Sequence, residues 1–126
     1  MKYEIICSIC GKPSHSLLSY TCPSCGQPLT VTLDASFETG KIQKQNYSFW
    51  RYASFFPYVK EADIVTLGEG WTPLVKFSDG VYFKLESLNP TGSFKDRGST
   101  TLISALHKTI KGKAGYIAED SSGNAG

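Results

Sequence analysis

The sequence predicts an α/β domain preceded by a small metal-binding module. Two paired cysteine motifs near the N-terminus and a strand–helix–strand order in the second half of the chain support this fold class. The composition, with 40% hydrophobic and 19% charged residues, is typical of a globular chain rather than a disordered one. The length of 126 residues suits one domain, or one domain plus a small module.

Charge and hydropathy argue against several classes of partner. The formal net charge of +2 provides no strongly basic surface of the kind that nucleic-acid binders use. No segment approaches the roughly 18 uninterrupted apolar residues of a membrane helix. The N-terminal segment MKYEIICSICG lacks the apolar core of a secretory signal. We therefore expect no nucleic-acid partner, no membrane partner and a cytoplasmic location.

Four cysteines form the pattern C-x2-C-x11-C-x2-C, and a glycine that suits a tight turn follows each pair. Zinc takes four thiolates in a tetrahedron, and a filled set leaves no position open for catalysis. Disulfides need an oxidising compartment, and a redox pair would not require a second matching pair. We therefore predict a structural zinc ribbon over residues 1–33, with strands at 16–20 and 29–33 and with iron as the alternative metal. The ligands would be Cys7, Cys10, Cys22 and Cys25.

Residues 34–60 are predicted to be a linker followed by an aromatic helical segment. The polar stretch 34–46 precedes seven closely spaced aromatic residues. Aromatic side chains can be stacking platforms for single-stranded nucleic acid, but the only basic residues of the aromatic stretch 47–60 are Arg51 and Lys60. We favour a short amphipathic helix that packs its rings into a core and is stopped by Pro57. The rings belong to Tyr47, Phe49, Trp50, Tyr52, Phe55, Phe56 and Tyr58.

The α/β pattern begins after residue 60. Residues 64–67 are strand-like, and residues 81–86 alternate between apolar and polar, which predicts a half-buried strand. Leucines and isoleucines at helical spacing predict a helix over 94–110. A short buried strand follows at 115–118, and the strand–helix–strand order implies a parallel pair.

Lys95 occupies an unusual position in this pattern. Ser93, with Asp96 three residues later, is typical of a capping box, which would make Lys95 the second residue of the helix. The positive end of the helix dipole disfavours a charged lysine there. A neutral amine could attack an aldehyde and form a Schiff base. The alternative is an exposed lysine whose stem passes the helix end, and local sequence alone favours it.

The last eight residues, 119–126, follow the predicted strand 115–118 as a loop of acidic, small hydroxyl, amide and glycine residues. Ligands of α/β sheets bind beyond the carboxyl ends of the strands. Exposed N–H groups in such a loop could bind an anion. An ordinary polar turn is an equally good interpretation of this segment by itself.

Three segments together, LGEGWTPLV, KLESLNPTGSFKDRG and SSGNAG, resemble the threonine synthase family. These are pyridoxal-phosphate enzymes of the tryptophan-synthase-β-like fold, or fold type II, and some carry an N-terminal cysteine-rich ribbon. The resemblance implies that Lys95 forms the Schiff base with the cofactor and later moves protons at the substrate. It implies that Phe94 packs beside the cofactor and that Asn124 hydrogen-bonds its 3′-oxygen. The loop for the substrate carboxylate would contain Ser121, Ser122, Gly123 and Ala125.

The resemblance also implies a reaction and an incomplete domain. The family converts O-phospho-L-homoserine and water into L-threonine and phosphate, a carbon–oxygen lyase reaction in which pyridoxal phosphate is the electron sink. Family members continue beyond the asparagine loop to a glycine-rich cup for the cofactor phosphate, whereas no two glycines are adjacent here. Residues 61–126 would therefore be the first part of a truncated catalytic domain. We expect the chain alone to be inactive, to need the missing C-terminal remainder, and to belong to a homodimer.

Two alternatives stay open at this point. The chain could come from a sister enzyme of the same fold, such as cysteate synthase or a threonine/serine dehydratase-like lyase. It could also be a zinc-ribbon interaction module that carries a degenerate remnant of an enzyme.

Overall fold

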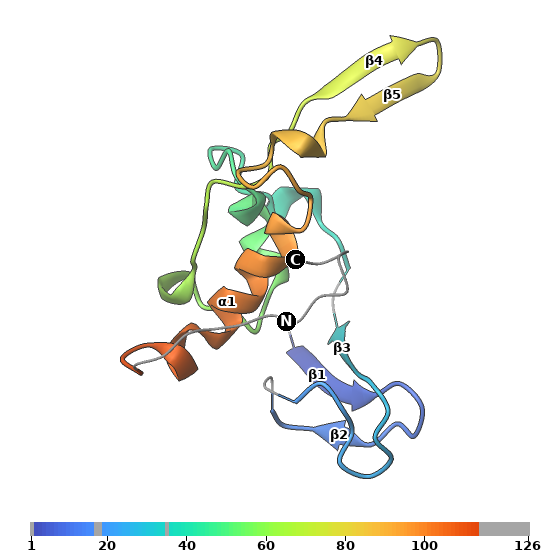
Figure 1. Cartoon of the computed structure of the whole chain (residues 1–126), viewed down its shortest axis with the longest axis vertical. Coiled ribbons are helices and arrows are strands. Elements are labelled where there is room, and N and C mark those ends of the chain that lie inside the picture. The colour runs from blue at the N-terminus through green and yellow to red at the C-terminus, as the bar shows by residue number, and fades with distance from the viewer. Residues whose placement is uncertain (1, 17–18, 35, 114–126) are drawn as a thin grey trace.

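The computed structural model describes residues 2–16, 19–34 and 36–113. A three-stranded sheet lies at one end, a helix with several short 3-10 helices lies in the middle, and a two-stranded hairpin projects at the other end (Figure 1). This mixture of helix and strand agrees with the predicted class. Both sheets are antiparallel, and the strand predicted at 115–118, which would form the parallel pair, lies outside the described residues.

The three-stranded sheet contains the cysteine motifs. β1 (Lys2–Cys7) lies between β2 (Pro13–Ser14) and β3 (Leu29–Asp34), and both pairings are antiparallel. The strand predicted at 29–33 is therefore confirmed. The strand predicted at 16–20 is wrong for its described residues 16, 19 and 20, because one edge of β1 pairs with β2 as the chain leaves the first cysteine turn and the other pairs with β3.

The aromatic segment is helical, as predicted, and the helix is of the 3-10 type. It ends before Pro57, and its core residue is Trp50, which is 2% exposed and lies 5.7 Å from the ring of Phe49. Tyr47 is 63% exposed and does not join this core. The four 3-10 helices are η1 (Thr39–Lys41), η2 (Phe49–Phe55), η3 (Glu61–Asp63) and η4 (Glu86–Leu88).

The strand predicted at 64–67 is wrong. The backbone N–H of Val65 donates to Ser104 Oγ at 2.8 Å, and the same hydroxyl donates to the Val65 carbonyl at 3.2 Å. A helix side chain therefore satisfies the backbone groups that a neighbouring strand would have paired.

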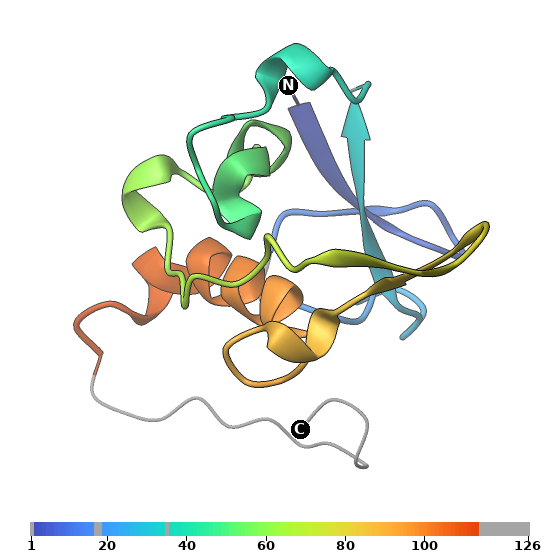
Figure 2. The same ribbon diagram turned by 90° about the horizontal axis from the view of Figure 1, so that it is seen from above.

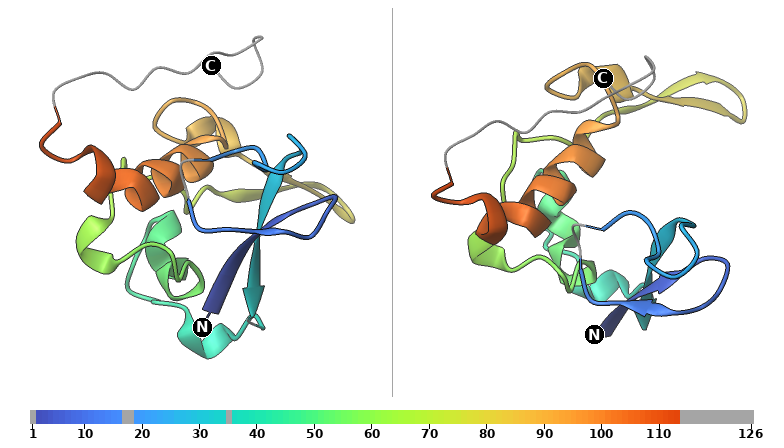
Figure 3. Two further views of the ribbon diagram at one scale, coloured as in Figure 1. Left: turned by 90° about the horizontal axis from the view of Figure 1, so that it is seen from below. Right: turned by 60° about the horizontal axis from the view of Figure 1, so that its bottom comes forward.

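The hairpin consists of β4 (Leu74–Ser78) and β5 (Val81–Lys84). The strand predicted at 81–86 is confirmed over 81–84, but its half-buried character is wrong. Val81 and Phe83, on the face expected to be buried, are 44% and 51% exposed. Because the hairpin extends away from the rest of the described chain, no described layer covers either of its faces (Figures 1 and 3).

Helix α1 (Asp96–Ile110) confirms the predicted helix, although it begins two residues later. It lies beside the short helices of the middle region (Figure 2). Its buried positions include two small polar residues, Thr100 and Ser104, which bond to the loop packed against them. Among the described residues, no helix is long and apolar enough to cross a membrane.

Candidate functional site

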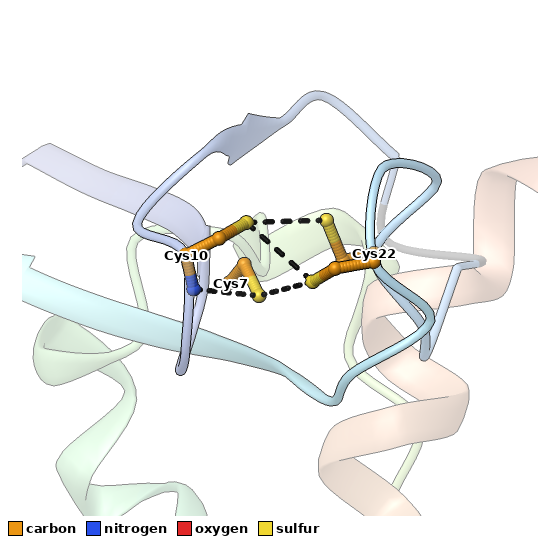
Figure 4. A group of neighbouring side chains, drawn as sticks. Cys7, Cys10 and Cys22 are labelled. Carbon is orange, nitrogen blue, oxygen red and sulfur yellow. Dashed lines mark hydrogen bonds between the residues drawn. The ribbon is translucent and has the colours of Figure 1, made fainter.

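The four cysteine sulfurs converge on one point. They lie within 4.8 Å of one another, and none is in a disulfide. Cys7 and Cys25 are 3.5 Å apart at Sγ, and Cys10 lies 3.7 Å from Cys22 and 3.5 Å from Cys25. Figure 4 shows the three labelled cysteines turned toward the same centre. A tetrahedron with metal–sulfur bonds of about 2.3 Å has edges of about 3.8 Å, so the four sulfurs fit a metal ion.

The two cysteine turns share one geometry. Gly11 N–H donates to the Cys7 carbonyl at 3.1 Å, and Gly26 N–H donates to the Cys22 carbonyl at 2.8 Å. Both glycines have positive φ, at 69° and 71°, where other residues are strained. Each turn therefore presents its two thiols in the same way, as the paired sequence motif predicted.

Backbone N–H groups point at the first sulfur of each turn. Those of Cys10 and Ile9 lie 3.4 and 3.5 Å from Cys7 Sγ and together lower the pKa of that thiol to about 6. The Ser24 N–H, 3.4 Å from Cys22 Sγ, is the largest cause of the lowered pKa of Cys22. These contacts favour the thiolate form, which is the form that binds metal.

Cys25 shows the opposite effect. The backbone N–H of Gln27 lowers its pKa, but the neighbouring thiols of Cys7 and Cys10 outweigh that contact and raise the pKa to about 12. Four adjacent sulfurs cannot all ionise against their mutual repulsion. A divalent cation at the centre would remove that repulsion, so the donor set fits a bound metal.

Lys95 lies at the N-cap of α1, not at its second residue. Its N–H donates to Ser93 Oγ at 3.2 Å, and its carbonyl accepts from the Ser99 N–H at 2.9 Å. The predicted capping box between Ser93 and Asp96 is wrong. Asp96 instead accepts from the N–H of Thr91 at 2.9 Å and from the Thr91 hydroxyl. These bonds link the residues on the two sides of the Lys95 turn.

The other predicted cofactor and substrate residues are less constrained by the structure. Phe94, beside Lys95, is 61% exposed. Asn124 and the loop of Ser121, Ser122, Gly123 and Ala125 lie outside the described residues.

Sequence reasoning missed an ion pair behind the Lys95 turn. Arg97 donates from Nε and Nη2 to the two oxygens of Glu86, at 2.9 and 2.8 Å. The hydrogen bonds from Arg97, followed by those from Thr72 and Asn89, hold the pKa of Glu86 at about 2 despite partial burial. The sequence signal was the pair of motifs KLE and KDRG, whose charged residues have no local partner at helical spacing.

Sequence reasoning also missed a buried carboxylate. Glu69 is 0% exposed and accepts three hydrogen bonds. Two come from its own loop, from the hydroxyl of Thr66 at 2.9 Å and the N–H of Leu67 at 2.8 Å, and one comes from the Thr100 hydroxyl of α1 at 2.8 Å. A glutamate between two glycines in a loop was the available signal. The Glu69 carboxylate links its loop to α1, whose N-cap is Lys95.

Comparison with known proteins gives a consistent result. Residues 65–126 match the family model described as pyridoxal-phosphate dependent enzyme. A threonine synthase of Methanosarcina acetivorans is 35% identical over 97% of this chain and 32% of its own length. Threonine synthases of Methanocaldococcus jannaschii and Halalkalibacterium halodurans are 37% and 40% identical over 81% and 61% of this chain, and over 28% and 24% of their own lengths. No solved structure matches.

These matches confirm the resemblance that the three motif segments predicted. The first match extends over nearly the whole chain, and so includes the cysteine module as well as the Lys95 turn. The chain spans only about a third, or less, of the length of these relatives.

Proposed function

We propose that this chain, whose residues 65–126 belong to the pyridoxal-phosphate dependent enzymes, is part of a threonine synthase. The reaction would convert O-phospho-L-homoserine and water into L-threonine and phosphate. The observation that carries the proposal is Lys95, which begins α1 within the segment that the family model matches. The similarity to threonine synthases over 97% of the chain supports the choice of substrate.

Lys95 would hold the cofactor through its side-chain amine. The fit is good, because no described residue accepts a hydrogen bond from that amine while both ends of its backbone are held. The exposed ring of Phe94 would pack beside the cofactor, and Asn124 would bind its 3′-oxygen. When bound, pyridoxal phosphate supplies an electron sink for the substrate carbons. The loop for the substrate carboxylate would be Ser121, Ser122, Gly123 and Ala125.

The cysteine cluster would hold a structural zinc ion, with iron as the alternative. The sulfur–sulfur distances of 3.5–3.7 Å support four thiolate ligands around one ion. The proposed division of the chain is a zinc ribbon at 1–33, a linker and aromatic segment at 34–60, and the first part of the pyridoxal-phosphate domain at 61–126. Four cysteines free of disulfides favour a reducing, cytoplasmic location.

We propose that these residues do not catalyse the reaction without the remainder of such an enzyme. The relatives are about three times as long, and two adjacent glycines that could form the cofactor phosphate cup are absent from this sequence. The active form would therefore combine this segment with a C-terminal remainder, in a homodimer. The three relatives compared above are named threonine synthase, so cysteate synthase, a dehydratase-like lyase and a degenerate remnant are not favoured.

A chimeric enzyme tests the proposal. The stretch of the Methanosarcina acetivorans threonine synthase that aligns with this chain would be replaced by these 126 residues. We expect the chimera to release threonine and phosphate from O-phospho-L-homoserine. The Lys95→Ala chimera should release neither, and Lys95→Arg, which keeps the charge, should be equally inactive.

Two further measurements keep the result interpretable. Cooperative unfolding of each chimera shows that it folds, and mass spectrometry after borohydride reduction shows whether pyridoxal phosphate is attached to Lys95. A folded chimera that carries the cofactor at Lys95 but makes no threonine would contradict the proposed reaction. A folded chimera without cofactor at Lys95 would contradict the role of that residue.

A further inference from the structure

The turn that carries Lys95 is weakly held by its own backbone. The N–H groups of Asp96 and Arg97 reach back to the carbonyls of Ser93 and Phe94, and both distances are 3.3 Å. Hydrogen bonds of this length lie beyond the usual 2.7–3.2 Å range for N–H donors. The position of Lys95 therefore depends as well on the Ser99 N–H, 2.9 Å from its carbonyl, and on side-chain contacts outside the turn.

Arg97 supplies one set of these contacts. Its guanidinium binds both oxygens of Glu86, and Nη2 also lies 3.3 Å from the Thr72 hydroxyl. Two parallel hydrogen bonds from a planar guanidinium fix orientation as well as distance. The backbone two residues after Lys95 is thereby tied to η4, which is eleven residues away in the chain.

Glu86 is itself immobilised. The Asn89 amide donates to the Glu86 carbonyl at 2.8 Å and to Oε2 at 3.0 Å, and the Thr72 hydroxyl donates to Oε1 at 2.5 Å. Asn89 in turn accepts from the Gly70 N–H at 2.9 Å. Arg97 is therefore bound to a carboxylate that a neighbouring loop holds in place.

A second connection lies one helical turn further along α1. Glu69, which is fully buried, accepts from Thr100 at 2.8 Å. The loop thus holds α1 at two successive turns, through Arg97 and through Thr100. Lys95 lies just before the first of them.

We infer that Arg97 is a positioning residue for Lys95, fixing through Glu86 the backbone from which the lysine amine is presented. The inference rests on the proposed function for what that amine does. A lysine side chain is flexible, so its backbone anchor decides which points the amine can reach. Covalent chemistry requires the amine to be placed to within about 0.5 Å.

The test uses the zinc-loaded 126-residue chain and needs no cofactor. Arg97→Met removes the two hydrogen bonds to Glu86 and the one to the Thr72 hydroxyl, and Arg97→Lys keeps the charge but loses the planar fork. Lys76→Met is the matched control, because it removes an exposed ion pair with Asp79 on the hairpin. Amide hydrogen exchange reports the backbone of 95–99, and competitive acetylation with acetic anhydride at one pH reports the accessibility of the Lys95 amine against the exposed Lys44.

In Arg97→Met we expect the protection of the Ser99 amide, which donates to the Lys95 carbonyl, to fall at least about tenfold. The acetylation rate of Lys95 relative to that of the exposed Lys44 should change. Amides at 106–110 should keep their protection, Arg97→Lys should restore part of the loss, and Lys76→Met should change nothing.

Two results would overturn the inference. An equal loss of protection along the whole of α1 would make Arg97 a general stabilising residue. Unchanged protection of the Ser99 amide and an unchanged acetylation rate of Lys95 would mean that the turn does not need Arg97. A chimera that binds no pyridoxal phosphate would refute the proposed function but not these measurements, so the two failures are distinguishable.

Discussion

The cysteine module and the Lys95 turn are both held by hydrogen bonds, but these bonds span different distances along the chain. The four thiols lie within residues 7–25, and backbone N–H groups of the same two turns orient them. The Lys95 turn depends on Glu86, eleven residues from its partner, and on Glu69, thirty-one residues from its partner.

Because of this difference, mutations in the two regions should have different effects. The cysteine module gathers its four thiols from two turns of its own residues. The Lys95 turn is complete only when a loop, η4 and α1 are assembled together. Changes to the metal ligands should therefore act locally, whereas changes to the loop should reach Lys95.

Metal loss should have the largest effect. Cys22→Ser removes a buried ligand, and structural zinc in small modules contributes about 10–16 kcal/mol of apparent binding free energy. We expect metal content to fall to near zero and amides of 2–34 to exchange as in an unfolded chain. Elemental analysis and hydrogen exchange measure this, with His15→Ala as the control that keeps the metal. A tenfold loss of protection throughout α1 would refute the independence of the two regions.

Removing the buried carboxylate should have the next largest effect. Glu69→Ala leaves the buried Thr100 hydroxyl and two part-buried donors of Thr66 and Leu67 without their acceptor, which costs about 3 kcal/mol in the free energy of unfolding. Glu69→Gln keeps one amide oxygen and should lose less. Denaturant unfolding of the zinc-loaded chain measures both. Equal stability of Glu69→Ala and the original chain would show that the loop does not hold α1.

The close approach of the loop to η2 gives a smaller effect. Gly70 has φ of 95°, and a Cβ there would lie 2.6 Å from the backbone nitrogen of Phe49. Gly70→Ala should therefore destabilise the chain by about 2 kcal/mol. Gly98→Ala is the matched comparison, because Gly98 lies inside α1 with open space around it and should gain about 0.5–1 kcal/mol. Thermal unfolding distinguishes the two signs, and a stabilised Gly70→Ala would contradict the close packing.

Acid should weaken the Lys95 turn by the smallest amount. The pKa of Glu86 is lowered from 4.5 to about 2, chiefly by Arg97, so its contribution is full above pH 4.5 and is lost as the pH falls toward 2. Because the pair is partly exposed, we expect about 1 kcal/mol. The difference in unfolding free energy between the original chain and Glu86→Gln should shrink over that interval. A constant difference from pH 6 to pH 2 would refute the ion pair.

Local patterns predicted a large part of the fold. The cysteine spacing located the metal cluster, the ribbon layout located β3, helical spacing located α1, and alternation located β5. The aromatic stretch indicated a core segment, and Trp50 is its buried residue. Each of these predictions depends on residues that are close to one another in the sequence.

Predictions that depended on which other residue a segment contacts were less successful. The strand at 64–67 is absent because Ser104 of α1, not another strand, binds its backbone. The capping box failed because Asp96 reached Thr91 rather than Ser93. The half-buried hairpin failed because burial depends on a covering layer, and alternation says nothing of where that layer is.

The sequence by itself determined the two chemical centres: four thiols at metal-binding spacing, and a lysine at the start of a helix within family motifs. Only the tertiary structure decided how the lysine is held. Glu69, Glu86 and Arg97 find partners eleven or thirty-one residues away, and no local rule selects among the charged residues of the chain. Burial and bidentate geometry select them, because a carboxylate removed from water is stable only where several donors already converge.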